Sequence, residues 1–285
     1  MKAAISFELS HCDDLQVYDR YTKLLNIVDS DLANFVARKV NGTIPVFIDP
    51  TPRDHVKTSP PLSQLYYAPK KPIIASRRIA ILVADGFNIV EVKAVREMLA
   101  SAKATTWIIG PQRAEIHASG GQHDSLIADH HFEGQRSTLF DALYIPSGTK
   151  HAKALNECGR AVHWVREAFG HCKAIGAIGE GSPFFVIWLQ FIHSRWFSIF
   201  EGVNVVRHAI GLSEVKLNFE EKSDRVISSY GVVTAGKYDM KSATTEGFEI
   251  SPGSDKGFVS NFAYEISKHR CYERETDGLA SRVAY

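Results

Sequence analysis

Residues 174–181 carry the pattern that comes closest to a catalytic motif. The string AIGAIGEG is a short apolar run that continues into Gly179, Glu180 and Gly181. Many α/β enzymes place a nucleophile at such a sharp strand-to-helix turn, because glycine tolerates positive φ and allows close approach of the helix. Here Gly179 occupies the crest of the turn and has no side chain. The turn therefore keeps the form of a nucleophile site, and no covalent catalysis is expected there.

The cysteines do not replace the missing nucleophile. They lie far apart and without C-x-x-C spacing, at Cys12, Cys158, Cys172 and Cys271. This spacing predicts neither a zinc site nor a disulfide framework. Cys158 and Cys172 flank the turn in sequence, but Cys172 precedes the strand and should lie at the opposite end of the sheet. Neither is singled out by a basic partner or a helix start, so both are expected to be structural thiols.

Residues 123–131 contain the side chains of metal ligands. They are His123, Asp124, Asp129, His130 and His131. Their spacing fits no standard metal motif, and adjacent histidines on a strand or loop point in different directions. We therefore expect no metal site here, and a solvated loop that leads to the next strand.

A phosphate-binding loop is a further alternative. The loop after the first predicted strand, residues 85–88, reads Asp-Gly-Phe-Asn. Asp85 would repel a phosphate group, and the loop has a single glycine. The glycine order at 176–181 is not the dinucleotide fingerprint either. The pattern does not favour a bound cofactor, and flavin or nucleotide binding stays an alternative.

Strands and helices alternate from residue 78 onward and would position these segments. Apolar runs and helical periodicity predict strands at 78–84, 105–109, 142–145, 174–178 and 226–235, and helices at 90–99, 161–169 and 256–268. This order predicts an α/β fold with a doubly wound, mainly parallel sheet and helices on both faces. Function in such sheets lies at the carboxyl ends of the strands, where the turns at Asp85, Pro146 and Gly179 would gather.

A helical segment and a linker precede this domain. Residues 15–26 predict one helix, and a second helix is predicted to begin at Ser30 as N-cap and to stop at Asn41-Gly42. Six of the eleven prolines lie between residues 50 and 72, which is typical of an extended linker. We therefore divide the chain into a helical segment at 1–48, a proline-rich linker at 49–76 and an α/β domain at 77–285.

Composition predicts a soluble protein that binds neither nucleic acid nor membrane. The 285 residues are 45% hydrophobic and carry a formal net charge of +1. The N-terminus has no apolar signal segment, so a cytoplasmic location is expected. Residues 182–209 are the exception, because SPFFVIWLQFIHSRWFSIF is apolar on every face. Its polar interior makes it a poor membrane span. It is either a divergent core helix or sequence from an unspliced intron, and we favour the second.

Five strings resemble the C-terminal domain of large-subunit haem catalases, particularly those of fungi. They are RRIAILVADGFN, FDALYIPSG, GRAVHWVREAFGHCKAIGAIGEG, SSYGVVTAGKYD and KHRCYERETDGL. A further string near the N-terminus, ISFELSHCDDLQVYDRY, resembles the last helices of the catalase body. The resemblance implies a flavodoxin-like domain related to the ThiJ/PfpI and class I glutamine amidotransferase superfamily.

The resemblance implies an accessory role rather than catalysis. Catalases remove hydrogen peroxide in the oxidative-stress response with a haem held by a proximal tyrosinate. The R-x-F-x-Y string that carries this tyrosine in the family does not occur in the chain. We therefore expect no haem and no peroxide chemistry in this chain. Its expected partners are the catalase body and its homotetramer, and a holdase-like chaperone action on unfolded clients is also implied.

Glu91 is the site residue that the resemblance singles out. ThiJ/PfpI relatives pair an elbow cysteine with a nearby acid, and Glu91 matches the acid while Gly179 matches the cysteine. One interpretation is a vestigial pocket in which Glu91 meets the amides of Gly179 and Glu180. We favour the other, a partly buried glutamate capped by backbone donors. A hydrolase or glyoxalase stays an alternative, and it would require Cys158, Cys172 or Ser182 beside Glu91.

Overall fold

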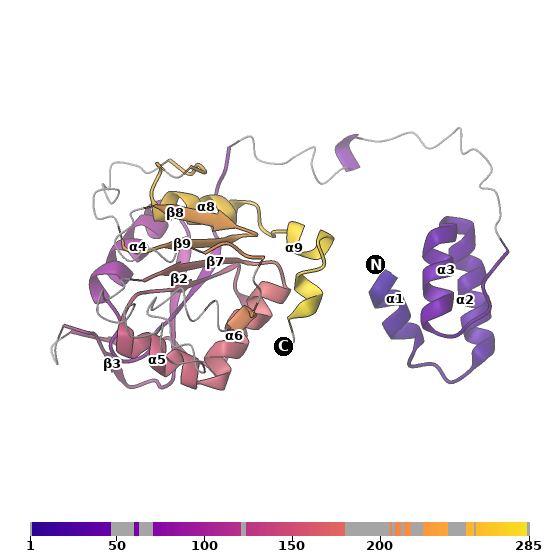
Figure 1. Cartoon of the computed structure of the whole chain (residues 1–285), viewed down its shortest axis with the longest axis horizontal. Helices are drawn as coiled ribbons and strands as arrows, with labels where there is room; N and C mark the ends of the chain where they lie inside the picture. Colours follow the sequence, from indigo (N-terminus) through magenta and orange to yellow (C-terminus); the bar gives the residue numbers. More distant parts are fainter. Residues whose placement is uncertain are drawn as a thin grey trace, which may run out of the picture. The chain divides into compact units, whose positions relative to one another are not determined.

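The computed structural model consists of two compact units, Met1–Ala68 and Pro69–Tyr285. It describes residues 2–46, 60–62, 71–120, 124–179, 206, 209–211, 214–217, 225–238, 249–253 and 255–283 (Figure 1). The division between the units falls inside the predicted linker. Most of the apolar segment 182–209 lies outside the described residues. In the part of the chain that is described, no helix has both the length and the apolar character needed to cross a membrane.

The helices described at the start of the first unit are α1 (Lys2–Leu9), α2 (Leu15–Val28) and α3 (Ser30–Lys39). The predicted cap at Ser30 is wrong by one residue, because the carboxylate of Asp29 accepts the Leu32 amide at 2.9 Å. An N-cap side chain bonds the amide two or three residues ahead, and Asp29 is placed to do so. Asn41 has a φ of 55°, the left-handed conformation expected where the helix stops.

A seven-stranded sheet forms the centre of the second unit, in the order β5-β2-β1-β6-β7-β9-β8. The strands are β1 (Arg78–Leu82), β2 (Thr105–Gly110), β5 (His130–His131), β6 (Ala142–Ile145), β7 (Ala174–Ile178), β8 (Val226–Ser229) and β9 (Val232–Ala235). Among the strand pairs described for this sheet, β8 with β9 is antiparallel and the others are parallel. The strand order runs outward in both directions from β1 and β6. The predicted doubly wound, mainly parallel sheet is therefore confirmed.

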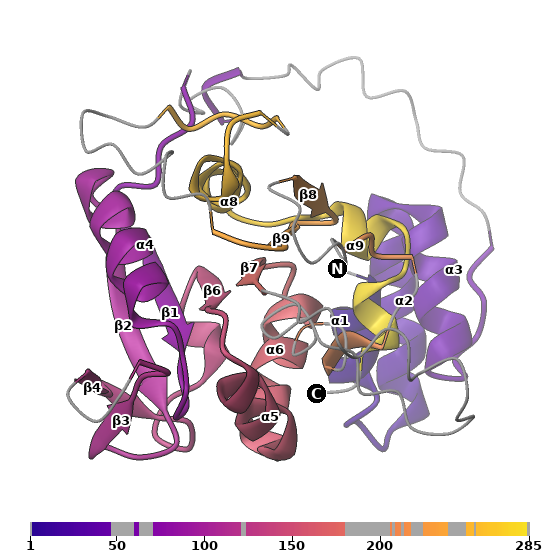
Figure 2. The same cartoon turned by 60° about the vertical axis from the view of Figure 1, so that its left-hand side comes forward.

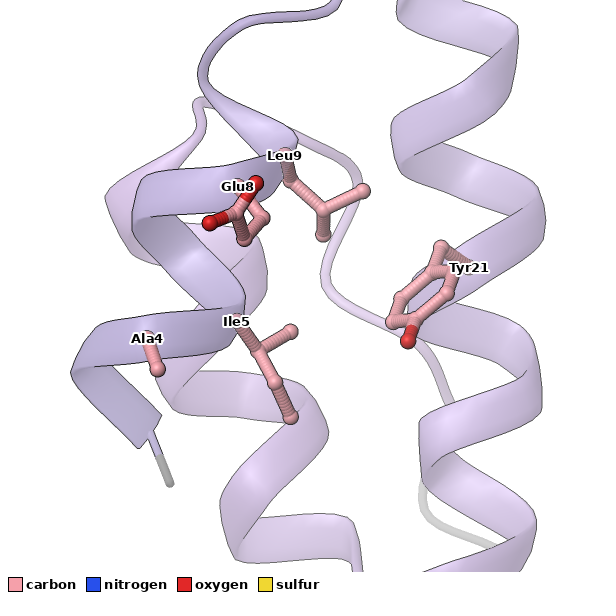
Figure 3. A pocket seen from close by; sticks show the side chains of 5 residues that line it. All are labelled: Ala4, Ile5, Glu8, Leu9 and Tyr21. Carbon is pink, nitrogen blue, oxygen red and sulfur yellow. The ribbon is translucent and has the colours of Figure 1, made fainter.

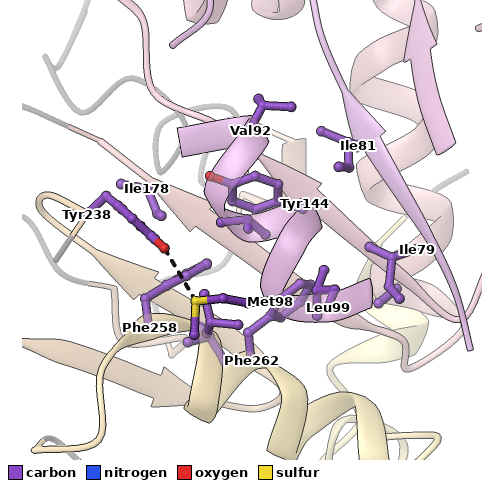
Figure 4. Packing of buried hydrophobic residues seen from close by; sticks show 14 of the residues in the cluster. Ile79, Ile81, Val92, Met98, Leu99, Tyr144, Ile178, Tyr238, Phe258 and Phe262 are labelled. Carbon is purple, nitrogen blue, oxygen red and sulfur yellow. Dashed lines mark hydrogen bonds between the residues drawn. The ribbon is translucent and has the colours of Figure 1, made fainter. Parts of the chain in front are cut away.

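Helices cover both faces of the sheet (Figure 2). They are α4 (Ile89–Ser101), α5 (Thr149–Glu157), α6 (Gly159–Gly170) and α8 (Phe258–Ser267), and the short α9 (Glu273–Thr276) follows α8. Alternate strand residues enter two separate cores, as strand geometry requires. Leu82 of β1 packs in the core that contains Trp164 of α6. Ile81 packs in the other core with Phe262 of α8 (Figure 4).

Short elements complete the fold. A two-stranded antiparallel sheet pairs β3 (Glu115–His117) with β4 (Ser125–Ile127). Three 3-10 turns are described, η1 (Pro60–Leu62), η2 (Ser137–Leu139) and η4 (Ala280–Arg282).

Two segments differ from the prediction. The strand predicted over 226–235 is a hairpin, in which Tyr230 (φ 49°) and Gly231 (φ 71°) form the turn between β8 and β9. Two successive residues with positive φ match the twist of a tight hairpin. The solvated loop predicted around His130 and His131 is instead the edge strand β5, which pairs parallel with the end of β2. A two-residue strand is too short to give a periodic signal.

Candidate functional site

The turns after β1 and β6 are locked together at the carboxyl edge of the sheet. The Asn88 amide donates to the Ser147 carbonyl at 2.9 Å. Gly148 has a φ of 139°, and a Cβ at this position would lie 2.1 Å from the carbonyl oxygen of Gly86. Only glycine permits this approach of two backbones. The predicted gathering of the Asp85 and Pro146 turns is thus present in the structure.

Glu91 holds the β6 turn from the first turn of α4. The helix begins at the Asn88 cap, whose side chain accepts the amides of Val90 and Glu91. The Glu91 side chain is 2% exposed. Its Oε2 accepts the Ser147 amide at 2.9 Å and its Oε1 accepts the Ser147 hydroxyl at 2.7 Å. We call this pair the Glu91–Ser147 clamp. It agrees with a carboxylate capped by a backbone donor.

Ser147 is the site residue that sequence reasoning missed. It follows the apolar run of β6 within the string FDALYIPSG, and a hydroxyl directly after a buried strand was the available signal. The residue is 2% exposed, and its hydroxyl donates to a carboxylate. A nucleophile must reach its substrate, so this buried hydroxyl stabilises the turn rather than attacking a substrate.

Gly179 contributes to the sheet instead of to the clamp. Its amide donates to the Ala235 carbonyl at 3.1 Å and extends the pairing of β7 with β9. This contact does not agree with the interpretation in which Glu91 meets the Gly179 amide, and the favoured interpretation of a capped glutamate does not require it. Gly176 lies inside β7, where a Cβ would come within 3.0 Å of the Phe258 and Phe262 rings, so close packing accounts for its small size. Glu180 lies outside the described residues.

Burial shifts the pKa of two further groups at this edge, Tyr144 and His151, in favour of their neutral forms. Burial raises the pKa of Tyr144 well above its ordinary value, and the negative charge of Glu91 raises it further. The ring of His151 in α5 is fully buried, and its Nδ1 accepts the Ala84 amide at 3.0 Å. Burial lowers the pKa of His151 to about 4 against the opposing backbone hydrogen bonds to Ala84 and Pro146. At neutral pH these two side chains therefore supply neither a cationic imidazole nor a tyrosinate.

The structure brings neither Cys158 nor Cys172 to the clamp. Cys158 lies between α5 and α6, after the nine residues of α5 that lead away from the clamp. Cys172 precedes β7 at the amino end of the strand, and burial raises the pKa of its thiol. Ser182 lies outside the described residues. Among the described side chains, no cysteine is placed as an activated nucleophile beside Glu91.

Polar side chains of residues 124–131 accept hydrogen bonds from backbone amides. The Asp129 carboxylate accepts the Ile108 amide at 2.7 Å, and Nδ1 of His131 accepts the Glu133 amide at 3.0 Å. The His130 ring stacks on Trp107. Within the described segments, no group of three or more His, Cys, Asp or Glu side chains is placed to hold a metal ion. His123 lies outside those segments.

Tyr144 and Tyr230 do not fit the role of a proximal haem ligand. A proximal tyrosinate must be stabilised in its charged form. Tyr144 is buried without a hydrogen-bond partner for its hydroxyl, yet its raised pKa disfavours tyrosinate. The Tyr230 hydroxyl donates to Asp277 at 2.7 Å, and this hydrogen bond raises its pKa. No step of a reaction is therefore assigned to a haem bound by these residues.

The mainly parallel sheet covered by helices and the buried acid at the start of α4 fit a DJ-1/PfpI-type domain. The DJ-1/PfpI family model matches residues 77–244, and the chain belongs to this family. A solved THiJ/PfpI family protein from Pseudomonas syringae is 13% identical, covers 80% of each chain and has a TM-score of 0.45.

Catalases are similar to the chain over its whole length. Catalase A of Aspergillus fumigatus is 39% identical over 100% of this chain, which corresponds to 35% of that catalase. Catalase-1 of Neurospora crassa is 39% identical over 99% of this chain and 34% of its own length. The chain thus spans about a third of the relatives it matches, and it is similar to their C-terminal region.

Proposed function

We propose that this chain is a non-catalytic accessory region of a large-subunit catalase, and that it stabilises the catalase body and its oligomer. One observation carries the proposal. The DJ-1/PfpI match begins at residue 77, whereas the similarity to fungal catalases also includes the helical unit. The combination of the two units is therefore shared with catalases and is not a general property of the DJ-1/PfpI family.

The geometry of the clamp supports a role without chemistry. The elbow position, Gly179, lacks a side chain, and the Ser147 hydroxyl is buried and bound to Glu91. Acyl transfer or hydrolysis at such an edge requires an accessible nucleophile and a base that can take its proton. Among the described residues, the Glu91–Ser147 clamp supplies a structural hydrogen-bond pair instead.

The helical unit supports the proposed partner. Val17, Tyr21, Leu24 and Val28 recur at helical spacing on one face of α2, and between 37% (Val17) and 70% (Val28) of each residue is exposed. We call these four residues the α2 stripe. Tyr21 also borders a cavity of about 270 Å³ between α1 and α2 (Figure 3). A continuous apolar stripe is typical of a surface that another protein covers, and burial of such area stabilises a complex.

A chimaera tests the proposal. The matched C-terminal region of Aspergillus fumigatus Catalase A is replaced by this chain, and the body without any C-terminal region serves as reference. We expect the chimaera to keep the oligomeric mass of the catalase in light scattering. On heating, the chimaera should lose its haem absorbance and its peroxide decomposition at a higher temperature than the reference does. Equal inactivation temperatures for the two proteins would contradict the proposal.

Two variants locate the effect on the surface. Leu24→Asp places a charge in the α2 stripe and should lower the inactivation temperature of the chimaera to near that of the reference. Gln16→Asp introduces the same charge on an exposed polar position of the same helix and should leave it unchanged. Equal effects of the two variants would remove the α2 stripe from the proposal. The chain expressed by itself should show no Soret band and negligible oxygen release from peroxide.

A further inference from the structure

Two cysteines meet at the amino edge of the sheet, far from the Glu91–Ser147 clamp. Cys172 precedes β7 in the left-handed conformation with a φ of 58°, and Cys271 lies between α8 and α9. The Cys271 amide donates to the Cys172 carbonyl at 2.7 Å. A backbone hydrogen bond of this length places the two Cα atoms about 5–6 Å apart, within the range that a disulfide spans. Both thiols are free, and the residues are 5% and 7% exposed.

Both sulfur atoms lie beside the start of α9. Burial raises the pKa of each thiol. The charge of Arg274 opposes burial at both positions, whereas the charge of Glu275 at Cys172 and the charges of Glu273 and Glu265 at Cys271 raise the pKa further. Arg274 therefore lies beside both thiols.

Arg274 adds a buried cation to this turn. The residue is 0% exposed, its Nε donates to the Tyr230 carbonyl and its Nη1 donates to the Phe169 carbonyl at 3.1 Å. Its Nη2 is buried without a hydrogen-bond partner. A Cβ on Gly231 would lie 2.9 Å from this Nη2 and 3.4 Å from the Cys271 sulfur. The unpartnered donor and the Cys271 thiol therefore converge on one point, where a positive charge favours the thiolate.

We propose that Cys172 and Cys271 form a reversible disulfide when the protein meets hydrogen peroxide or an organic hydroperoxide. The Cys271 thiolate attacks the peroxide, the O–O bond breaks, and Cys271 becomes a sulfenic acid. The departing oxygen takes up the proton that the thiol had released, which gives water from hydrogen peroxide or an alcohol from an organic hydroperoxide. The Cys172 sulfur then attacks the sulfenic sulfur, so that the S–S bond forms and the S–O bond breaks. The hydroxyl group leaves with the Cys172 proton as water.

The disulfide would tie the C-terminal segment to the sheet. Cys271 is followed by α9 and η4, and the Leu279 side chain of this segment packs in the core that contains Trp164. A covalent link to the residue before β7 would hold this segment in place under oxidation. The inference does not depend on the proposed accessory function, since it concerns thiols within the α/β unit.

Peptide mapping of the whole chain tests this inference. The reduced protein is freed of reductant, treated with hydrogen peroxide, blocked with N-ethylmaleimide and digested without reduction. We expect a peptide pair joined through Cys172 and Cys271, lighter by two hydrogen atoms than the separate peptides, and absent after dithiothreitol. The half-buried Cys158 should carry the blocking reagent. Peroxide-treated protein in which Cys172 and Cys271 are each blocked, or are joined to other cysteines, would overturn the proposal.

Variants and kinetics provide the controls. Cys158→Ser should form the linked pair as the unchanged protein does, whereas Cys271→Ser should abolish it. The rate should not change when the protein is diluted tenfold, because the bond forms within one chain. If Cys271→Ser does not fold, the peptide map of the unchanged protein still decides the matter. A rate that falls in proportion to dilution would indicate bonds between molecules and would contradict the inference.

Discussion

The two ends of β6 carry the same arrangement of a buried glutamate and a serine. At the carboxyl end, Glu91 accepts the Ser147 amide at 2.9 Å and the Ser147 hydroxyl at 2.7 Å. At the amino end, a single oxygen of Glu167 in α6, Oε2, accepts both the Ser137 amide at 3.0 Å and the Ser137 hydroxyl at 2.6 Å. We call the second pair the Glu167–Ser137 clamp. Glu167 lies at the amino edge of the sheet, away from the turn at Gly179. A glutamate–serine pair therefore also forms where no nucleophile is expected.

The comparison explains Glu91 without a catalytic role. A helix on each face of the sheet supplies one carboxylate, which accepts the amide and the hydroxyl of a serine in a turn. Without the carboxylate, these two donors would be buried and unpaired. The difference lies in the surrounding charge. Lys173 is 1% exposed, and its Nζ donates to the carbonyls of Ser137 and Phe140 at 2.5 and 2.6 Å. The attraction of Glu167 favours the charged form of this lysine. The amino-end clamp thus also balances a buried cation.

Glu167→Ala should have the largest effect on stability. It leaves the Ser137 donors unpaired and removes a negative charge beside buried Lys173, so we expect a loss of about 3–5 kcal/mol. Urea unfolding followed by tryptophan fluorescence measures it, since all four tryptophans lie after residue 77. Glu133→Ala breaks an exposed ion pair with Arg160 and serves as control, with a loss of about 0–1 kcal/mol. A smaller loss for Glu167→Ala than for Glu91→Ala would break the comparison.

The buried bases at the two edges should give separate pH dependences. The folded pKa of His151 is about 4 and its ordinary value is 6.5, so the unfolded chain binds more protons between these values. Stability should fall by up to about 3 kcal/mol as the pH drops through this window. His151→Gln should flatten this part of the profile. An unchanged acid profile in that variant would assign the effect to other groups.

Lys173 should determine how the free energy of unfolding depends on pH on the alkaline side. Burial lowers its pKa to about 8 from 10.5, so the unfolded chain again binds more protons, here between pH 8 and 10.5. Stability should therefore rise with pH across this interval, until other groups titrate. Lys173→Met should remove the rise. A profile that falls between pH 8 and 10 in the unchanged protein would contradict this assignment.

Glu91→Ala should cost less than Glu167→Ala. The change leaves the amide and hydroxyl of Ser147 without this carboxylate, for which we expect a loss of about 1–3 kcal/mol. Glu97→Ala lies on the exposed face of the same helix and should change stability little. In the chimaera described above, Glu91→Ala should reduce activity only through lost stability. Loss of activity at temperatures where the fold is intact would restore a direct role for Glu91.

The smallest effects should come from the two serines. Ser147→Ala and Ser137→Ala each remove one hydroxyl and retain the amide bond to the carboxylate. Each should therefore cost about 1 kcal/mol, with similar values at the two ends. Urea midpoints of the two variants provide the measurement. A clearly larger cost for Ser147→Ala would show that the carboxyl-end clamp does more than stabilise a turn.

Local sequence determined most of the elements. The strands 142–145 and 174–178 were predicted with their observed bounds, because short continuous apolar runs between turn residues form buried strands. The doubly wound order followed from the alternation of strands and helices. Where the local signal was ambiguous, the prediction was wrong. The run 226–235 reads as one strand, and only pairing of β8 with β9 separates it at Tyr230 and Gly231.

Tertiary structure decided which polar groups meet. Glu91 and Ser147 are 56 residues apart, and Glu167 and Ser137 are 30 apart, so no periodic pattern connects them. The sequence indicated Glu91 through resemblance, but its partner, the matching clamp at the opposite edge and the meeting of Cys172 with Cys271 appear only in the folded chain. The physical reason is that hydrophobic periodicity is a property of neighbouring residues, whereas a buried polar group takes whichever partner the closed fold brings within reach.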